Sequence, residues 1–174
     1  PLPPPFNRRP RLGARVLVKN NFTMVVNPVI NEMSSWQVEL RAKAAVLLRT
    51  MLVYLEENAT QHVQQLCLAF ISASKDDSVV RQVGECCRLV GRFVKPREWL
   101  GVLLDRLGPS YETNVRAGAV GVLAHVLSGA SHESMAEKEE EGEEEEEEDK
   151  CGEVLRALAE PSLAGSADTA LRAA

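Results

Sequence analysis

An apolar residue followed directly by arginine recurs three times along the chain, each time near the start of an apolar helical stripe. The pairs are Leu40-Arg41, Val80-Arg81 and Val115-Arg116, so the arginines are 40 and 35 residues apart. A small or flexible residue follows each arginine by three positions: Ala44, Gly84 and Ala119. Recurrence at this period indicates stacked helical repeats, which constrain the fold more than any single residue does. Such repeats build extended surfaces for partners.

The apolar positions around these pairs follow the helical period. Pro28 interrupts the first such pattern and predicts a kink inside a helix. We expect helices over about residues 22–34, 36–57, 61–73, 79–94, 97–107 and 114–127. The predicted fold class is therefore all-α, a short right-handed α-solenoid within residues 21–130. Its three helical pairs cover about residues 22–57, 58–95 and 96–129.

Both ends of the chain differ from this region in composition. Residues 1–20 are rich in proline and arginine and contain no acid, so we expect them to be unstructured. The short apolar run at 13–20 fits either a helix or a strand. Residues 131–150 carry twelve acids and two lysines, which predicts an unfolded acidic low-complexity linker. Residues 151–174 are expected to form a weakly helical tail.

The formal net charge of −5 averages these unlike zones. The repeat region is close to neutral, with eleven basic and ten acidic residues over 21–130, so we expect no nucleic-acid and no membrane partner. The chain contains no long uncharged apolar run, and its first twelve residues lack the apolar core of a secretory signal. The four cysteines have no zinc-binding spacing, which favours a reducing, cytoplasmic setting. We expect no metal and no cofactor.

No catalytic constellation emerges from the sequence, and we expect a protein that is not an enzyme. The three histidines, His62, His125 and His132, have no nucleophile or carboxylate at a recognisable spacing. Asp76-Asp77 precedes a predicted helix, where capping acids belong. Cys86-Cys87 lies within an apolar stripe and is expected to pack in the core. We therefore predict no catalytic, cofactor-binding or metal-binding residues.

Three sets of charged residues have alternative readings. The acidic run is either a tail for basic partners or, as we favour, a solvated insertion. The basic residues between Arg8 and Lys19 form either a nucleic-acid or membrane patch or, as we favour, an unstructured terminus. The three repeated arginines either bind a partner or bond the acid or carbonyls of the preceding turn, and we expect the second role.

Stacking also predicts where apolar surface remains. A single helical pair cannot bury its own apolar face, so the neighbouring pairs must close the core. The outer faces of the first and third pairs have no such neighbour within residues 22–129. We expect these two faces to be partly apolar and to promote association of the isolated chain.

The paired helices, Pro28 and the repeated apolar-arginine pair resemble HEAT repeats over about residues 22–129. The HEAT motif also places an aspartate in the turn between its helices. Here only the middle pair has one, at Asp76 or Asp77, whereas the other turns contain Ser34-Ser35 and Ser110.

A closer resemblance covers about residues 23–128. The Met33-Ser34-Ser35-Trp36 turn, the Arg41-Ala42-Lys43 start, the 57–62 linker ENATQH and the 90–96 segment VGRFVKP resemble the C-terminal HEAT units of the axonemal dynein assembly factor family. The resemblance implies a cytoplasmic, non-enzymatic scaffold for preassembly of the dynein arms of motile cilia, with dynein chains and chaperones or assembly factors as partners. That family is longer, which implies that this chain is a fragment or an alternative product.

A second function remains open from the residues alone. A general HEAT-repeat interaction scaffold of the nuclear-transport or chromosome-associated type would use the acidic segment to bind basic partners.

Overall fold

The computed structural model describes residues 2, 6–130, 152 and 156. Within them the chain forms helices and no strand. The elements are α1 (Leu12–Glu32), α2 (Val38–Leu55), the 3₁₀ helix η1 (Glu56–His62), α3 (Val63–Ala73), α4 (Val80–Phe93), α5 (Pro96–Asp105) and α6 (Thr113–Gly129). None of these helices combines the length and apolar character needed to cross a membrane. The predicted all-α solenoid of about three HEAT-like hairpins is confirmed.

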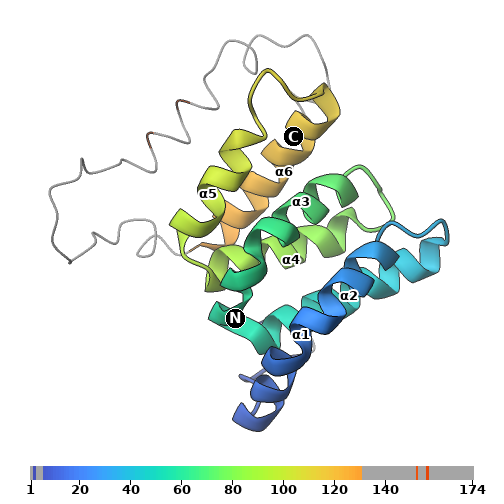
Figure 1. Cartoon of the computed structure of the whole chain (residues 1–174), viewed down its shortest axis with the longest axis vertical. Coiled ribbons are helices and arrows are strands. Elements are labelled where there is room, and N and C mark those ends of the chain that lie inside the picture. The colour runs from blue at the N-terminus through green and yellow to red at the C-terminus, as the bar shows by residue number, and fades with distance from the viewer. Residues whose placement is uncertain (1, 3–5, 131–151, 153–155, 157–174) are drawn as a thin grey trace, which may run out of the picture.

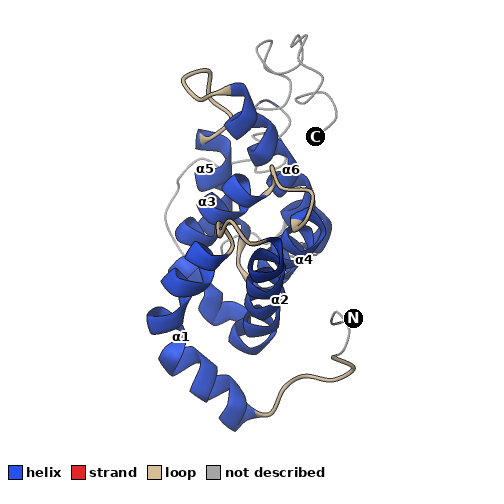
Figure 2. Ribbon diagram, turned by 90° about the vertical axis from the view of Figure 1, so that its right-hand side faces the viewer, coloured by secondary structure: helices blue, strands red, loops and turns tan. Residues whose placement is uncertain are grey.

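The six α-helices form two layers. Figure 2 shows α1, α3 and α5 on one side of the molecule and α2, α4 and α6 on the other. Figure 1 shows the three hairpins stacked from the first pair to the third, in chain order. The helices α4 and α6 of the second layer run parallel. A later residue of α4 contacts a later residue of α6. Thus Gly84 of α4 lies against His125 of α6, and Arg88 lies against Gly129.

One apolar core runs through all three pairs. The largest fully buried side chains are those of Trp99, Phe22 and Phe70, one from each hairpin. Trp99 keeps its indole satisfied because Nε1 donates to the carbonyl oxygen of Val94 at 3.2 Å. The core therefore joins the hairpins into one stack, as repeats of this kind require.

The second and third pairs approach each other through backbone. A methyl group added at Gly91 of α4 would overlap the carbonyl of Val126 in α6. A methyl group added at Gly129 of α6 would overlap the carbonyl of Arg88 in α4. Glycine at these two positions is what allows α4 and α6 to pack so closely.

The N-terminal prediction is wrong from residue 12 onward. We expected residues 1–20 to be unstructured, but α1 begins at Leu12 and continues through Pro28. The reason lies in distant residues: Arg15 of α1 forms an ion pair with Glu56, which is 41 positions later. Such a contact has no local signature in the sequence.

The break between the helices expected at residues 36–57 and 61–73 also differs, since α2 ends at Leu55 and the 3₁₀ helix fills residues 56–62. The acidic linker at 131–150 and nearly all of the tail at 151–174 lie outside the described residues.

Candidate protein-binding surface

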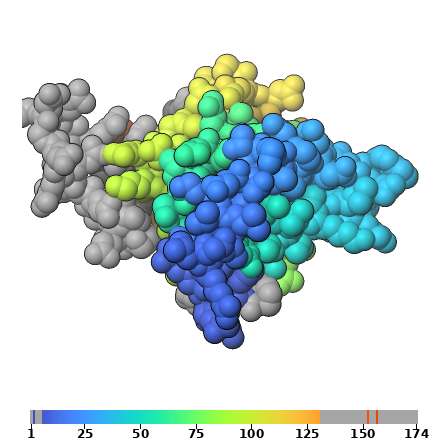
Figure 3. All heavy atoms as spheres, turned by 60° about the horizontal axis from the view of Figure 1, so that its bottom comes forward, coloured from blue at the N-terminus to red at the C-terminus, as the bar shows by residue number. Residues whose placement is uncertain are grey.

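Exposed apolar side chains gather on the first helical pair. Of the eleven large apolar side chains that are exposed in the described part of the chain, nine lie between residues 12 and 47. They are Leu12, Val16, Leu17, Met24, Trp36, Val38, Leu40, Val46 and Leu47. In the space-filling view of Figure 3, α1 forms the projecting front edge of the molecule. The expected apolar outer face is thus present on the first pair. It is not seen on the described residues of α5 and α6.

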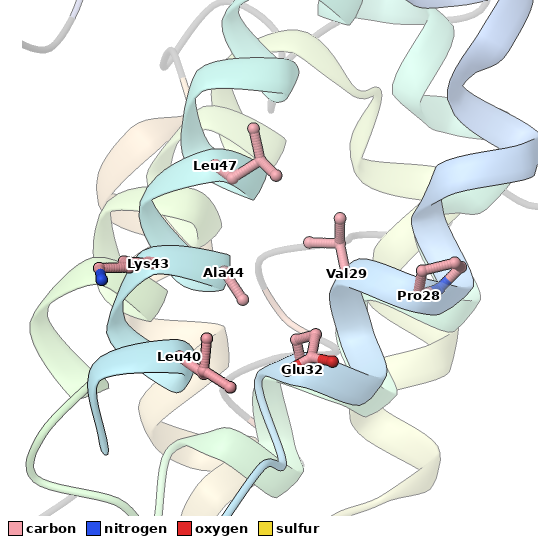
Figure 4. Close-up of a pocket in the computed structure, with 7 residues that line it drawn as sticks. All are labelled: Pro28, Val29, Glu32, Leu40, Lys43, Ala44 and Leu47. Atoms are coloured by element: carbon pink, nitrogen blue, oxygen red, sulfur yellow. The ribbon is translucent and has the colours of Figure 1, made fainter. Parts of the chain in front are cut away.

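A groove between α1 and α2 lies within this face. It has a volume of about 300 Å³ and is lined by Pro28, Val29, Glu32, Leu40, Lys43, Ala44 and Leu47. Figure 4 shows Leu40 and Ala44 of α2 and Val29 of α1 facing the space between the two helices, whereas the ammonium of Lys43 points away from it. The groove is therefore an apolar depression with one charged residue of each sign at its edge. This character suits an apolar side chain of a protein partner.

The repeat itself shows what kind of element fits this face. In α4, Cys86 follows Arg81 by five positions, and its Sγ contacts the carbonyl oxygen of Ala45 in α2 at 3.7 Å. The equivalent position in α2, five residues after Arg41, is Val46, which is 39% exposed. Thus α2 presents to solvent the side that α4 presents to a neighbouring helix. A helix is the natural occupant of such a side.

The first of the repeated arginines joins two hairpins. Arg41 donates from Nη1 to the carbonyl oxygens of Ser35 at 2.8 Å and Trp36 at 3.1 Å. It also forms an ion pair with Asp76 in the turn of the next hairpin. Hydrogen bonds from the hydroxyl and backbone amide of Ser78, with the charge of Arg41, lower the pKa of Asp76. The predicted structural role is present, but the acid belongs to the following turn.

The other two arginines differ from the first. Arg116 is buried, and its Nε donates to the carbonyl oxygen of Leu107 at 3.1 Å, just after the preceding helix α5 ends. The side chain of Arg81 is 86% exposed and lies 3.9 Å from Glu85 on its own helix. The repeated arginine therefore bonds to neighbouring turns in the first and third hairpins and faces solvent in the second.

His62 and His125, for which the sequence predicts no catalytic role, lie in different elements, η1 and α6. His62 packs edge-on against Phe22, with ring centroids 4.9 Å apart, and burial lowers its pKa. Burial, followed by the charge of Arg88, lowers the pKa of His125. Across the residues that the structure describes, no group of three or more histidine, cysteine, aspartate or glutamate side chains could hold a metal ion. His132 and Cys151 lie outside the described residues.

The cysteines of the stack are core residues. Cys67, Cys86 and Cys87 are free and buried. Burial raises the pKa of Cys67 to about 12 and raises the pKa values of Cys86 and Cys87 as well. Since the thiolate is the reactive form, these side chains behave as small apolar groups, as the stripe at Cys86-Cys87 predicted.

Sequence reasoning missed an ionic cluster around Glu56. This residue is buried and has a φ of 52°, a conformation that ordinarily favours glycine. Its carboxylate accepts a hydrogen bond from Arg9 Nε at 2.7 Å and also pairs with Arg15. Two of the basic residues between Arg8 and Lys19, which we expected to lie in an unstructured terminus, thus form ion pairs inside the protein. The one feature of the sequence that marks this site is the acidic pair Glu56-Glu57, which directly follows the apolar run at residues 51–55.

Comparison with known proteins agrees with this architecture. A family described as dynein axonemal assembly factor 5, HEAT-repeat domain, matches residues 1–153. Dynein axonemal assembly factor 5 of Homo sapiens is 32% identical over 134 residues, which cover 76% of this chain and 15% of that protein. The Mus musculus protein of the same name is 33% identical over 143 residues, covering 76% and 16%. The Xenopus laevis protein is 27% identical over 130 residues, covering 74% and 15%. The chain thus spans 15–16% of the length of these relatives.

Proposed function

Because the chain belongs to the dynein axonemal assembly factor 5 HEAT-repeat family, we propose that it is a non-enzymatic scaffold for cytoplasmic preassembly of axonemal dynein arms. Its partners in this proposal are dynein chains and the chaperones or assembly factors that act with them. The observation that carries the proposal is the apolar α1–α2 face, which concentrates the exposed apolar side chains of the described residues on one hairpin.

The chemistry of this face indicates how a partner binds. The groove has apolar walls from both helices, and Val46 occupies the position through which α4 meets its own neighbour. An amphipathic helix would place its apolar stripe along α2, with a large side chain in the groove. Glu32 and Lys43 lie at the edge of the groove. They would disfavour a partner helix that places an acidic side chain next to Glu32 or a basic side chain next to Lys43.

A pull-down from multiciliated-cell lysate tests the proposal. The full chain is expected to retain dynein heavy or intermediate chains together with assembly factors. Leu47→Asp places a charge at the groove and should reduce this recovery at least tenfold. Leu68→Asp is the matched control, because Leu68 is 37% exposed on α3 and Leu47 is 44% exposed on α2.

The control separates loss of the face from loss of the fold. Both variants should keep the helical circular-dichroism spectrum of the parent chain. If Leu47→Asp and the parent chain recover equal amounts of dynein chains, the apolar α1–α2 face is not the binding surface. Recovery of histones or import cargo in place of dynein chains would overturn the proposed function.

A further inference from the structure

The segment before α1 is attached to the end of α2 at two points. Residues 6–11, which we call the strap, contain no helix, and Arg11 at their end has an extended backbone. Figure 2 shows this loop leaving the start of α1 and running toward the side of the second layer. The strap contacts the end of α2 through the side chains of Phe6 and Arg9.

The first point of attachment is aromatic. The ring of Phe6 meets the ring of Tyr54 edge to face, with centroids 5.8 Å apart and planes at 83°. Phe6 is partly buried and packs against the apolar core. Tyr54 follows Leu47 by seven positions, which is about 10 Å along α2 at roughly 1.5 Å per residue. This contact is therefore separate from the groove between α1 and α2.

The second point of attachment is a carboxylate that binds guanidinium groups. Nε of Arg9 donates to Oε1 of Glu56 at 2.7 Å, and Nη2 of Arg9 donates to Oε2. Arg15 of α1 donates to the same Oε2, and the side chain of Arg15 is only 15% exposed. Glu56 therefore keeps one cation within the helical stack when Arg9 leaves. Its Oε1 then becomes available to another guanidinium.

The carboxylate is held in place at the junction of α2 and η1. Glu56 has a φ of 52° and a ψ of −128°, and only 4% of its surface is exposed. A residue other than glycine is strained in this conformation, and such strain clusters at ligand-binding positions that the surrounding structure holds fixed. The buried Ala59 of η1 follows directly. The carboxylate is thus part of the packed stack, whereas Arg9 belongs to the strap.

The strap itself makes few contacts between its two points of attachment. Asn7 and Arg8 are exposed, and the side chain of Arg9 is 63% exposed although it pairs with Glu56. Within the described part of the chain, residues 6–10 form no backbone–backbone hydrogen bond. Two side chains three positions apart therefore carry the attachment. An extended segment separates them by about 10 Å, at roughly 3.3 Å per residue.

We propose that Tyr54 and Glu56 form a docking site for an extended segment in which arginine follows an aromatic residue by three positions, and that the strap occupies this site in cis. A partner protein that carries such a segment displaces the strap. Arginine is specified because its planar guanidinium makes two parallel hydrogen bonds with the carboxylate. The tether gives the strap an effective concentration of about 1 mM, with which the partner competes. This inference stands independently of the proposed function.

Fluorescence polarisation with a labelled peptide of residues 6–11 tests the docking site. The double variant Phe6→Ala, Arg9→Gln removes both attachments of the strap and keeps Arg15 on Glu56. It should bind the peptide at least tenfold more tightly than the parent chain does. Arg8→Gln is the matched control, because Arg8 is exposed on the same segment, and it should bind the peptide as weakly as the parent. Equal binding to the double variant and the parent would overturn the proposal.

A second measurement does not depend on the folding of the double variant. The parent chain carries 4-fluorophenylalanine in place of Phe6, and the fluorine resonance reports whether this ring packs on Tyr54. Unlabelled peptide of residues 6–11 at about 10 mM, roughly ten times the effective concentration of the strap, should move the resonance to that of a solvent-exposed ring. A peptide with lysine in place of Arg9 should be at least fivefold less effective. A resonance that stays in place with the first peptide, or that moves equally with both, would contradict the proposed site.

Discussion

Arg41 of the first hairpin forms an ion pair with Asp76, which lies in the turn of the second hairpin. The same guanidinium donates to the carbonyl oxygens of Ser35 and Trp36 in its own turn. One side chain therefore fixes two successive turns relative to each other. Arg81 has no corresponding role, since its side chain projects into solvent.

Replacing Arg41 by alanine should destabilise the fold, because two carbonyl oxygens and one carboxylate lose a charged donor. We expect the free energy of unfolding to fall by about 1–3 kcal/mol. Arg81→Ala is the matched control and should change it by less than about 0.5 kcal/mol. Urea unfolding followed by circular dichroism measures both. Equal losses would contradict the role assigned to Arg41.

The Asp76 carboxylate predicts an acid-sensitive step. Its pKa is lowered in the folded protein, so the unfolded chain binds more protons as the pH falls. The stabilisation is present above the unfolded pKa of about 4 and is lost as the pH falls through the lower folded pKa. Asp76→Asn should flatten the decline of melting temperature between pH 5 and pH 3, while remaining less stable than the parent at pH 7. Parallel pH profiles for the two proteins would argue against this step.

The close packing of α4 on α6 predicts opposite effects for two Gly→Ala changes. Gly91→Ala forces a methyl group into the carbonyl of Val126 and should destabilise the fold by roughly 1–3 kcal/mol. Gly101→Ala meets no atom within 4 Å in α5 and should stabilise it by about 0.5–1 kcal/mol. Melting temperatures should therefore move in opposite directions. A shift of the same sign in both variants would be inconsistent with the observed packing.

The Glu56 cluster predicts a change in protease sensitivity. Glu56→Ala leaves Arg9 and Arg15 without their shared carboxylate and should cost about 2 kcal/mol of stability. Trypsin should then cleave after Arg11 and Arg15 at least fivefold faster. Glu57→Ala removes the adjacent acid, whose side chain is 67% exposed, and should leave the cleavage rate unchanged. Mass spectrometry of timed digests distinguishes the two.

The buried thiols predict slow alkylation. Cys67, Cys86 and Cys87 are buried, and burial raises their pKa values, so iodoacetamide at pH 8 should modify them only when the fold opens. Their labelling rates should be equal to one another and should rise together with urea. Rapid modification of any one of them in native buffer would show that this part of the core is open.

The helical stack could be predicted from sequence because its signals are local. The pairs at residues 40–41, 80–81 and 115–116 have a fixed relation to their apolar stripes, and Pro28 lies inside a helix as expected. The contacts that were missed are long-range. The start of α1 lies beside the Arg15–Glu56 pair, and the acid that meets Arg41 lies 35 residues later. The helical periodicity of the sequence does not indicate which distant residues form ion pairs.

The candidate surface was only partly predictable, for the same reason. Stacking predicted apolar outer faces at both ends, and the first pair has one, but the described residues of the third pair do not. The groove depends on how the residues of α1 and α2 that line it, Pro28 and Ala44 among them, are placed across the hairpin, which the apolar pattern does not specify.

The two junctions of the stack share the apolar core but differ in the other contacts that each one adds. The first and second hairpins are joined by the ion pairs Arg41–Asp76 and Arg49–Glu85, which lengthen at small cost and weaken in salt. The second and third meet through the backbone at Gly91 and Gly129, where there is no slack. Added salt should therefore loosen the contact between the first and second hairpins more than the contact between the second and third.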